Sequence, residues 1–167
     1  MAHPPARSKH PRSLIAGPYG HPFHPIAVII PIGAWVSGIL FDIVALAGGD
    51  PAVFAPGSRV LIIIGLIGAV VAAILGMIDW FGIPARTAAR GTATTHMLLN
   101  LLVMGLFLVS LLLRPADDAV PMLAFLAAAA GIVLLGASGW LGGKLAHTYG
   151  VRVADERTQA EGYESLP

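Results

Sequence analysis

The sequence predicts an all-α integral membrane protein, a four-helix bundle whose transmembrane helices run up-down-up-down. Three observations predict this class. Of the 167 residues, 56% are hydrophobic and only 11% are charged, whereas a soluble domain is about 25% charged. Four stretches without Asp, Glu, Lys or Arg recur at regular intervals: 25–41, 60–78, 97–113 and 119–143. None of them alternates apolar with polar residues, as the strands of a membrane barrel do.

Each stretch, together with its flanking residues, is long enough to cross a bilayer, which takes about 20 apolar residues. We expect helices over about 25–47, 58–80, 94–114 and 120–146. Ser58 is the predicted N-cap of the second helix, and Gly82-Ile83-Pro84 ends it. Thr92 to Thr95 cap the third helix, which ends at Arg114-Pro115. Pro121 falls in the first turn of the fourth helix, where proline is tolerated.

The domain organisation follows from the two polar ends of the chain. We expect a flexible basic tail over 1–20, a transmembrane domain over 21–152 and a flexible polar tail over 153–167. One side of the predicted bundle carries eight cationic residues: Arg7, Lys9, Arg12, Arg86, Arg90, Lys144, Arg152 and Arg157. The other side carries Arg59 and Arg114. The positive-inside rule therefore predicts a multi-pass membrane protein with both termini in the cytoplasm.

Composition and motifs exclude several classes of function. The absence of cysteine excludes disulfides and thiolate chemistry, and the net charge of +1 gives no general attraction to nucleic acid. No Gly-rich phosphate loop and no Ser-His-Asp arrangement is present, so the chain is not expected to be an enzyme on its own. Small residues at helical spacing, such as Gly65, Ala72 and Gly76, predict closely packed helices rather than a channel.

Polar groups gather at the predicted cytoplasmic ends of the four helices. His21 and His24 precede or open the first helix, Asp79 ends the second, His96 opens the third, and His147 closes the fourth. Ionisable groups at membrane depth are costly, so they usually pair with one another or have a function. The sequence therefore predicts a His/Asp cluster near the cytoplasmic face.

Two kinds of cofactor suit this cluster. His21, His24, Asp79 and His96 together are typical ligands of an iron, copper or zinc ion. Alternatively, His96 with His24 or His21 could hold the iron of haem b from opposite faces, as in bundle cytochromes. Asn100 lies one turn after His96 and could orient its ring.

A purely structural interpretation stays open beside these two. The cluster would then be interfacial and hydrogen-bonded, with Asp79 paired to Arg86 or Arg90 across a short loop. Asp42 stands apart near the outer end of the first helix, where it could be an ion site or a proton relay. We favour an ion pair with Arg114, which also borders apolar sequence, over one with Arg59.

Several of these motifs resemble a bacterial family of predicted membrane proteins, domain of unknown function 2231, over about residues 17–153. They are Gly20-His21-Pro22-Phe23-His24-Pro25, Pro31-Ile32-Gly33, Asp79, His96 with Asn100, and Gly139-Trp140-Leu141-Gly142-Gly143. The resemblance implies a four-helix inner-membrane domain, and a link to electron transfer because some relatives carry a fused Rieske-type domain. This chain departs from the family where Lys144 replaces an acidic residue and where His147 replaces an aromatic one.

Our leading hypothesis is an inner-membrane protein that binds a metal ion or haem b and serves in electron transfer. Its partners would be the lipid bilayer and a Rieske-type or other redox protein. The alternative is a non-catalytic membrane subunit or scaffold, whose partner is another membrane protein or a second copy of the chain. A proton or ion conduit that uses Asp42 is a third hypothesis.

Overall fold

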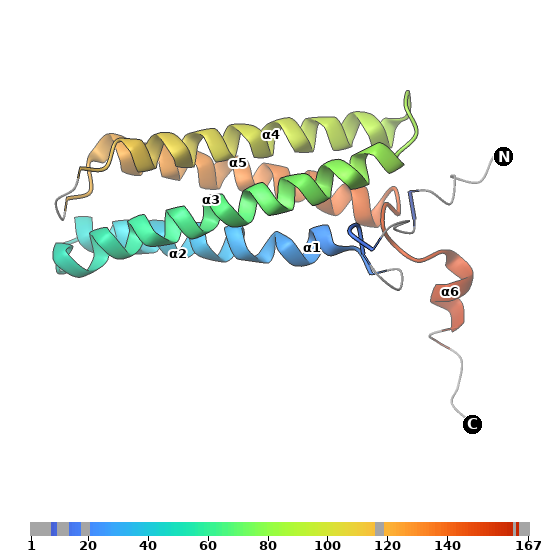
Figure 1. Ribbon diagram of the computed structural model, residues 1–167, viewed down its shortest axis with the longest axis horizontal. Coiled ribbons are helices and arrows are strands. Elements are labelled where there is room, and N and C mark those ends of the chain that lie inside the picture. Colours follow the sequence, from blue (N-terminus) through green and yellow to red (C-terminus); the bar gives the residue numbers. More distant parts are fainter. Residues whose placement is uncertain (1–7, 10–13, 18–20, 116–118, 162, 164–167) are drawn as a thin grey trace.

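The computed structural model describes residues 8–9, 14–17, 21–115, 119–161 and 163, and within them it contains helices and no strand. The helices are α1 (Phe23–Ala27), α2 (Ile29–Leu46), α3 (Pro51–Gly82), α4 (Ala88–Leu112), α5 (Met122–His147) and α6 (Glu156–Glu161). Four spans are long and apolar enough to cross a membrane, with α1 and α2 forming the first span together. Figure 1 shows them as a bundle of antiparallel neighbours. The predicted all-α, four-helix membrane fold is confirmed, and the cytoplasmic position of the termini stays a prediction.

The first span is interrupted between α1 and α2, at Val28. Pro31 stands four residues after Ala27, and proline has no N–H with which to bond the carbonyl of Ala27. The helix is resumed at once, because the N–H of Ile32 donates to the carbonyl of Val28 at 3.2 Å. The interruption leaves α1 as a separate turn that carries His24.

Two predicted N-caps are wrong, because both helices begin earlier in the chain. Asp50 caps α3 by accepting from the N–H of Ala52 at 3.0 Å, and Ser58 lies inside the helix. Thr87 caps α4 by accepting from the N–H of Arg90 at 3.2 Å. In each case the hydroxyl or carboxylate of the capping residue satisfies one of the unpaired N–H groups of the first turn.

The structure describes part of each predicted tail. The polar segment 153–167 contains the short helix α6. Most of the predicted basic tail lies outside the described residues. Of the part that is described, the carbonyl of Ser8 accepts a hydrogen bond from the N–H of Arg152 at 2.8 Å, which joins these two segments at one end of the bundle.

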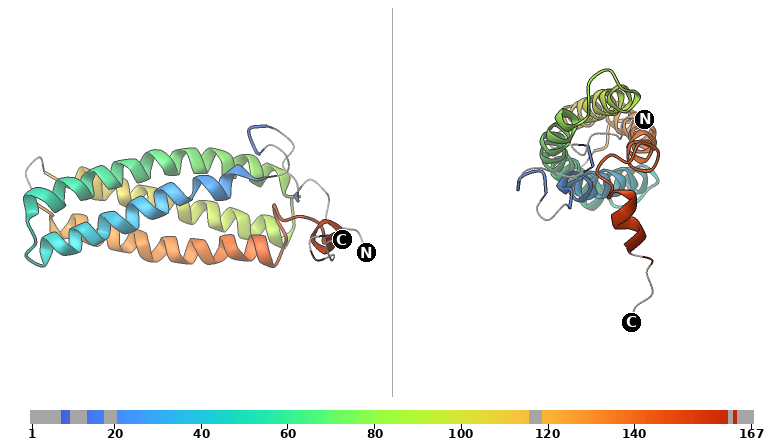
Figure 2. Two further views of the ribbon diagram at one scale, coloured as in Figure 1. Left: turned by 90° about the horizontal axis from the view of Figure 1, so that it is seen from below. Right: turned by 90° about the vertical axis from the view of Figure 1, so that its right-hand side faces the viewer.

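The bundle consists of two helical hairpins. The first hairpin is α1 and α2 packed on α3, and the second hairpin is α4 packed on α5. Helices contact each other more extensively within a hairpin than between the two hairpins. The end-on view of Figure 2 shows the four spans arranged around a common axis. We call the end that carries His24 and His147 the histidine end, and the other the ion-pair end.

Two aromatic rings fill the middle of this axis. Trp35 of α2 and Phe107 of α4 stack with ring centroids 4.2 Å apart and an interplanar angle of 4°. Each ring packs on a glycine of its own hairpin: a Cβ at Gly65 would overlap Trp35 Nε1, and one at Gly131 would lie 2.9 Å from Phe107 Cε2. The glycines therefore bring the backbone of α3 or α5 against a ring.

The two hairpins repeat one arrangement of residues. In the outgoing helices, residues correspond at a separation of 72 positions: His24 with His96, Trp35 with Phe107, and Asp42 with Arg114. In the return helices they correspond at 66 positions: Gly65 with Gly131, Ala72 with Ser138, and Gly76 with Gly142. Each outgoing pair meets across the axis, as equivalent residues do around a twofold axis. The hairpins are thus parallel repeats related by a pseudo-twofold axis along the bundle.

The outer surface of the bundle is apolar, as a surface in contact with lipid must be. Large hydrophobic side chains such as Ile67 (64% exposed) and Val133 (71% exposed) point outward along the spans. Trp140 near the histidine end is 80% exposed, and indole rings at this level of a span are typical of the membrane interface. The protein is therefore a multi-pass membrane protein whose surface contacts the bilayer.

The contact between Gly65 and Trp35 yields a prediction for stability. Gly65→Ala forces Trp35 out of its stack, and we expect the free energy of unfolding to fall by about 1–3 kcal/mol, as in other overpacked cores. The control is Gly105→Ala, because a Cβ at Gly105 meets nothing within 4 Å and alanine favours the helix. Thermal unfolding in detergent, followed by tryptophan fluorescence, measures both. Equal stability of the two variants would contradict the packing.

Candidate functional site

Two histidines face each other across the axis at the histidine end. The rings of His24 and His96 have centroids 6.4 Å apart and an interplanar angle of 86°. Both residues are half-buried. They are equivalent residues of the two hairpins, as Trp35 and Phe107 are. Each of these two pairs meets on the axis, the aromatic pair in the middle of the bundle and the histidine pair at its histidine end.

His24 is held by the return helix of its own hairpin. Its Nδ1 lies 2.9 Å from the carbonyl oxygen of Ala72 in α3. A carbonyl oxygen only accepts, so Nδ1 carries the proton and Nε2 keeps the lone pair in the neutral ring. A Cβ at Gly76 would lie 2.9 Å from His24 Cε1. The absence of a side chain at Gly76 therefore leaves space for the His24 ring, one helical turn after Ala72, whose carbonyl orients the ring.

His96 is held in the same way by α5. Its Nδ1 lies 2.8 Å from the carbonyl oxygen of Ser138, and a Cβ at Gly142 would lie 3.3 Å from its Cε1. The amide nitrogen of Asn100 lies 2.9 Å from the carbonyl oxygen of His96 and 3.1 Å from His96 Nε2. That amide donates to both atoms, so Nε2 carries the lone pair. Asn100 thus contacts the ring from one turn away, as the helical spacing predicted.

Asp79 pairs with neither Arg86, in the loop between α3 and α4, nor Arg90 of α4, contrary to one interpretation of the sequence. Arg152, after α5, donates from Nε to Asp79 Oδ1 at 2.8 Å, and both side chains are at most 10% exposed. Arg90 instead stacks on the Trp80 ring and donates to the carbonyls of Trp80 and Ile83. Asp79 lies three residues after Gly76, so this ion pair is about one helical turn from the glycine under His24, toward the end of α3.

The four residues proposed as metal ligands, His21, His24, Asp79 and His96, do not gather in one group. His21 is exposed before α1, and Asp79 is bound by Arg152. His147, which was not among the four, is exposed at the last position of α5. In the part of the chain that the structure describes, no three His, Asp or Glu side chains form a group that could hold a metal ion. The arrangement therefore offers two opposed imidazoles, His24 and His96, rather than three or four converging ligands.

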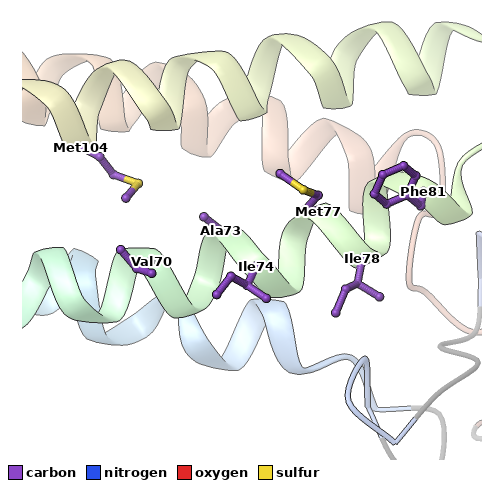
Figure 3. A pocket seen from close by; sticks show the side chains of 7 residues that line it. All are labelled: Val70, Ala73, Ile74, Met77, Ile78, Phe81 and Met104. Atoms are coloured by element: carbon purple, nitrogen blue, oxygen red, sulfur yellow. The ribbon is translucent and has the colours of Figure 1, made fainter.

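An apolar groove runs along the outside of the bundle between the two hairpins, at the level of the histidine pair. Its volume is about 310 Å³. It is lined by Val70, Ala73, Ile74, Met77, Ile78, Phe81 and Met104, shown in Figure 3. In that view Ala73 and Met77 of α3 and Met104 of α4 lie on facing sides of the gap.

At the ion-pair end, Asp42 pairs with Arg114, as the sequence predicted. Arg114 Nη1 donates to Oδ1 at 2.8 Å and Nη2 donates to Oδ2 at 2.5 Å. Arg59, the other predicted partner, donates instead to the carbonyl oxygen of Arg114 at 3.2 Å. Asp42 is thus neutralised by a cation within the bundle.

Sequence reasoning missed the groups that hold the site. The carbonyls of Ala72 and Ser138 have no sequence signal, because every residue carries one. Gly76 and Gly142 were visible only as small residues, and the spacing that links them to Gly65 and Gly131 would have revealed the repeat.

Comparison with known proteins identifies a family for most of the chain. Residues 20–155 match the family described as Predicted membrane protein (DUF2231). No curated protein matches the chain, and no solved structure does.

The hydrogen bonds at the histidine pair predict its tautomers. In ¹⁵N-histidine NMR of the protein in detergent, we expect His24 and His96 in the Nδ1–H form, whereas the exposed His147 averages over both forms. Asn100→Ala should shift the Nε2 resonance of His96 alone and lower the free energy of unfolding by about 1 kcal/mol for the lost hydrogen bonds. An Nε2–H tautomer at either ring would contradict this geometry.

Proposed function

This chain belongs to the DUF2231 family of predicted membrane proteins, whose description assigns no activity, and from its site we propose that it is an electron carrier of the bacterial inner membrane that binds haem b between His24 and His96. The observation that supports this most is the opposed pair of imidazoles on the axis.

The distance between the rings would allow His24 and His96 to bind the same iron. Since a metal–imidazole bond is about 2 Å long, two rings on opposite sides of an iron have centres about 6 Å apart. The centroids of His24 and His96 are 6.4 Å apart. Both rings donate from Nδ1 to a backbone carbonyl, which leaves Nε2 as the ligating atom. Such bonds fix ring orientation and raise the basicity of the ligating nitrogen.

The number of ligands favours haem over a bare metal ion. A porphyrin brings four nitrogens of its own, so the protein need supply only two. Zinc and non-haem iron need three or more protein side chains, and the described residues form no such group. Asn100 also contacts His96 Nε2, but its amide has a second acceptor in the carbonyl of His96 and can release the ring.

The chemistry that haem supplies when bound is one-electron transfer between its ferrous and ferric states. The chain's own residues orient the two ring nitrogens, and the buried ion pair of Asp79 and Arg152 joins α3 to the segment after α5 at the same end of the bundle. The apolar groove lined by α3 and by Met104 of α4 is suited to an edge of a planar apolar group that extends between the hairpins. Haem b would be held by these contacts without a covalent bond, because the chain has no cysteine.

The side of the membrane follows from charge. Lys9, Arg86, Arg90, Lys144 and Arg152 all belong to the histidine end. At the other end Arg114 is neutralised by Asp42, which leaves Arg59. The positive-inside rule then puts the histidine pair near the cytoplasmic face. Its electron partner would be a Rieske-type or other redox protein that reaches this face, or a membrane protein beside it.

Absorption spectroscopy of the purified protein tests the proposal. Protein from haem-sufficient cells, or protein titrated with haemin, should show a Soret band, and dithionite should give the sharp α band of a six-coordinate haem b. His24→Ala and His96→Ala should each abolish the six-coordinate spectrum. The matched control is His147→Ala, which should keep it because His147 is exposed at the end of α5.

The same variants discriminate the second candidate, a membrane subunit with a purely structural histidine pair. That function is favoured if wild-type protein stays unpigmented after haemin titration, while His24→Ala still lowers the melting temperature through the lost bond to Ala72. A Soret band that survives both histidine substitutions would overturn the proposed site.

A further inference from the structure

The ion pair of Asp42 and Arg114 joins the first hairpin to the second in the buried part of the bundle. Its two parallel hydrogen bonds are 2.8 and 2.5 Å long, and the side chains are 0% and 1% exposed. A bidentate pair of this kind is strong and strict in its geometry. Neither partner can be replaced by a like charge without leaving a buried charge uncompensated.

The two charges occupy equivalent positions of the repeat. Asp42 and Arg114 are separated by the same 72 positions that separate His24 from His96 and Trp35 from Phe107. In the other two pairs the two residues are of the same kind, imidazole with imidazole and aromatic with aromatic. In the ion pair, by contrast, the first hairpin contributes a negative charge and the second a positive charge. Of these three pairs, the ion pair is therefore the one that distinguishes the first hairpin from the second.

The consequence concerns which hairpins can associate. Around a twofold axis, two first hairpins would bring Asp42 against a second Asp42, and two second hairpins would bring Arg114 against a second Arg114. The stack of Trp35 and Phe107 would tolerate either combination, because both rings are flat and apolar. Like charges buried on the axis would not be tolerated, and rejection of wrong partners by repulsion is a common source of specificity.

We infer that Asp42 and Arg114 are the pairing determinant of the bundle: they direct the inner face of the first hairpin to the inner face of a second hairpin, in the same chain or in a second copy. The limited contact between the hairpins supports this role. So does Ser110, which accepts from Arg114 Nη2 at 3.4 Å and donates to the carbonyl of Ala124 at 2.7 Å, linking the arginine to α5. The inference does not depend on a bound cofactor.

Charge exchange in the full-length chain tests it. Asp42→Arg puts two arginines on the axis, and Arg114→Asp puts two aspartates there. We expect each to reduce the yield of monodisperse monomer in detergent at least tenfold, and the double variant D42R/R114D to restore at least half of it. An exposed charge reversal, Arg86→Asp, is the control and should behave as wild type. A double variant as defective as the single ones would overturn the inference.

Co-expression of the two single variants under different tags is a second test. The first hairpin of the D42R chain presents an arginine to the axis, and the second hairpin of the R114D chain presents an aspartate. These two hairpins should pair across chains, and so should the two unaltered ones. The defective proteins should therefore rescue each other as a 1:1 heterodimer that co-purifies through both tags. Failure of this rescue would overturn the inference even if both variants insert poorly alone.

An apolar replacement separates pairing from stability. D42L/R114M should fold, because well-packed apolar residues often replace a buried ion pair without loss. With the distinction between the hairpins removed, we expect size-exclusion chromatography to show dimers beside monomers. A strictly monomeric D42L/R114M protein would overturn the inference.

Discussion

The bundle depends on side chains that meet along one axis. In a bilayer the helices gain nothing by leaving water, so close packing and polar contacts must hold them together. Here three layers do so: two imidazoles, two stacked rings, and an ion pair. The rings can reach the axis because the return helices present glycine behind them. Each of these three contacts therefore joins one residue of the first hairpin to the equivalent residue of the second hairpin, as the pseudo-twofold repeat requires.

This arrangement explains why, among the described residues, the histidine end brings two imidazoles together and not more. A site on a twofold axis receives equal contributions from both repeats, and here each repeat contributes one imidazole. A polar residue whose equivalent position in the other hairpin is apolar does not take part in the histidine pair. Asp79 is the clearest case: its equivalent position is Leu145, and its carboxylate is taken by Arg152. The geometry favours a ligand that needs two opposed nitrogens and supplies the rest of its coordination itself.

Much of this could be predicted from the sequence. Four long apolar stretches fix the membrane fold, and the costs of burying charge in lipid led to the pairing of Asp42 with Arg114. The contact of Asn100 with His96 followed from helical spacing alone. The starts of α3 and α4 were missed, because Asp50 and Thr87 cap turns that precede the longest apolar stretches.

Two further features were not predicted from the sequence. The partner of Asp79 was missed because Arg152 comes from a left-handed turn after α5 (φ 59°), where sequence patterns give no direction. The repeat was missed because Trp35 and Phe107, and Asp42 and Arg114, share position and not identity.

The exposed indole of Trp140 has a consequence for how the histidine pair could be reached. Trp140 stands two residues before Gly142, on which the ring of His96 packs. If this indole rests among the lipid headgroups, as such rings do, then the imidazoles lie at the floor of the headgroup layer and not in the middle of the hydrocarbon. A water-soluble protein docked on the membrane surface would come within a few turns of helix of them, so exchange with the site would require no second transmembrane component.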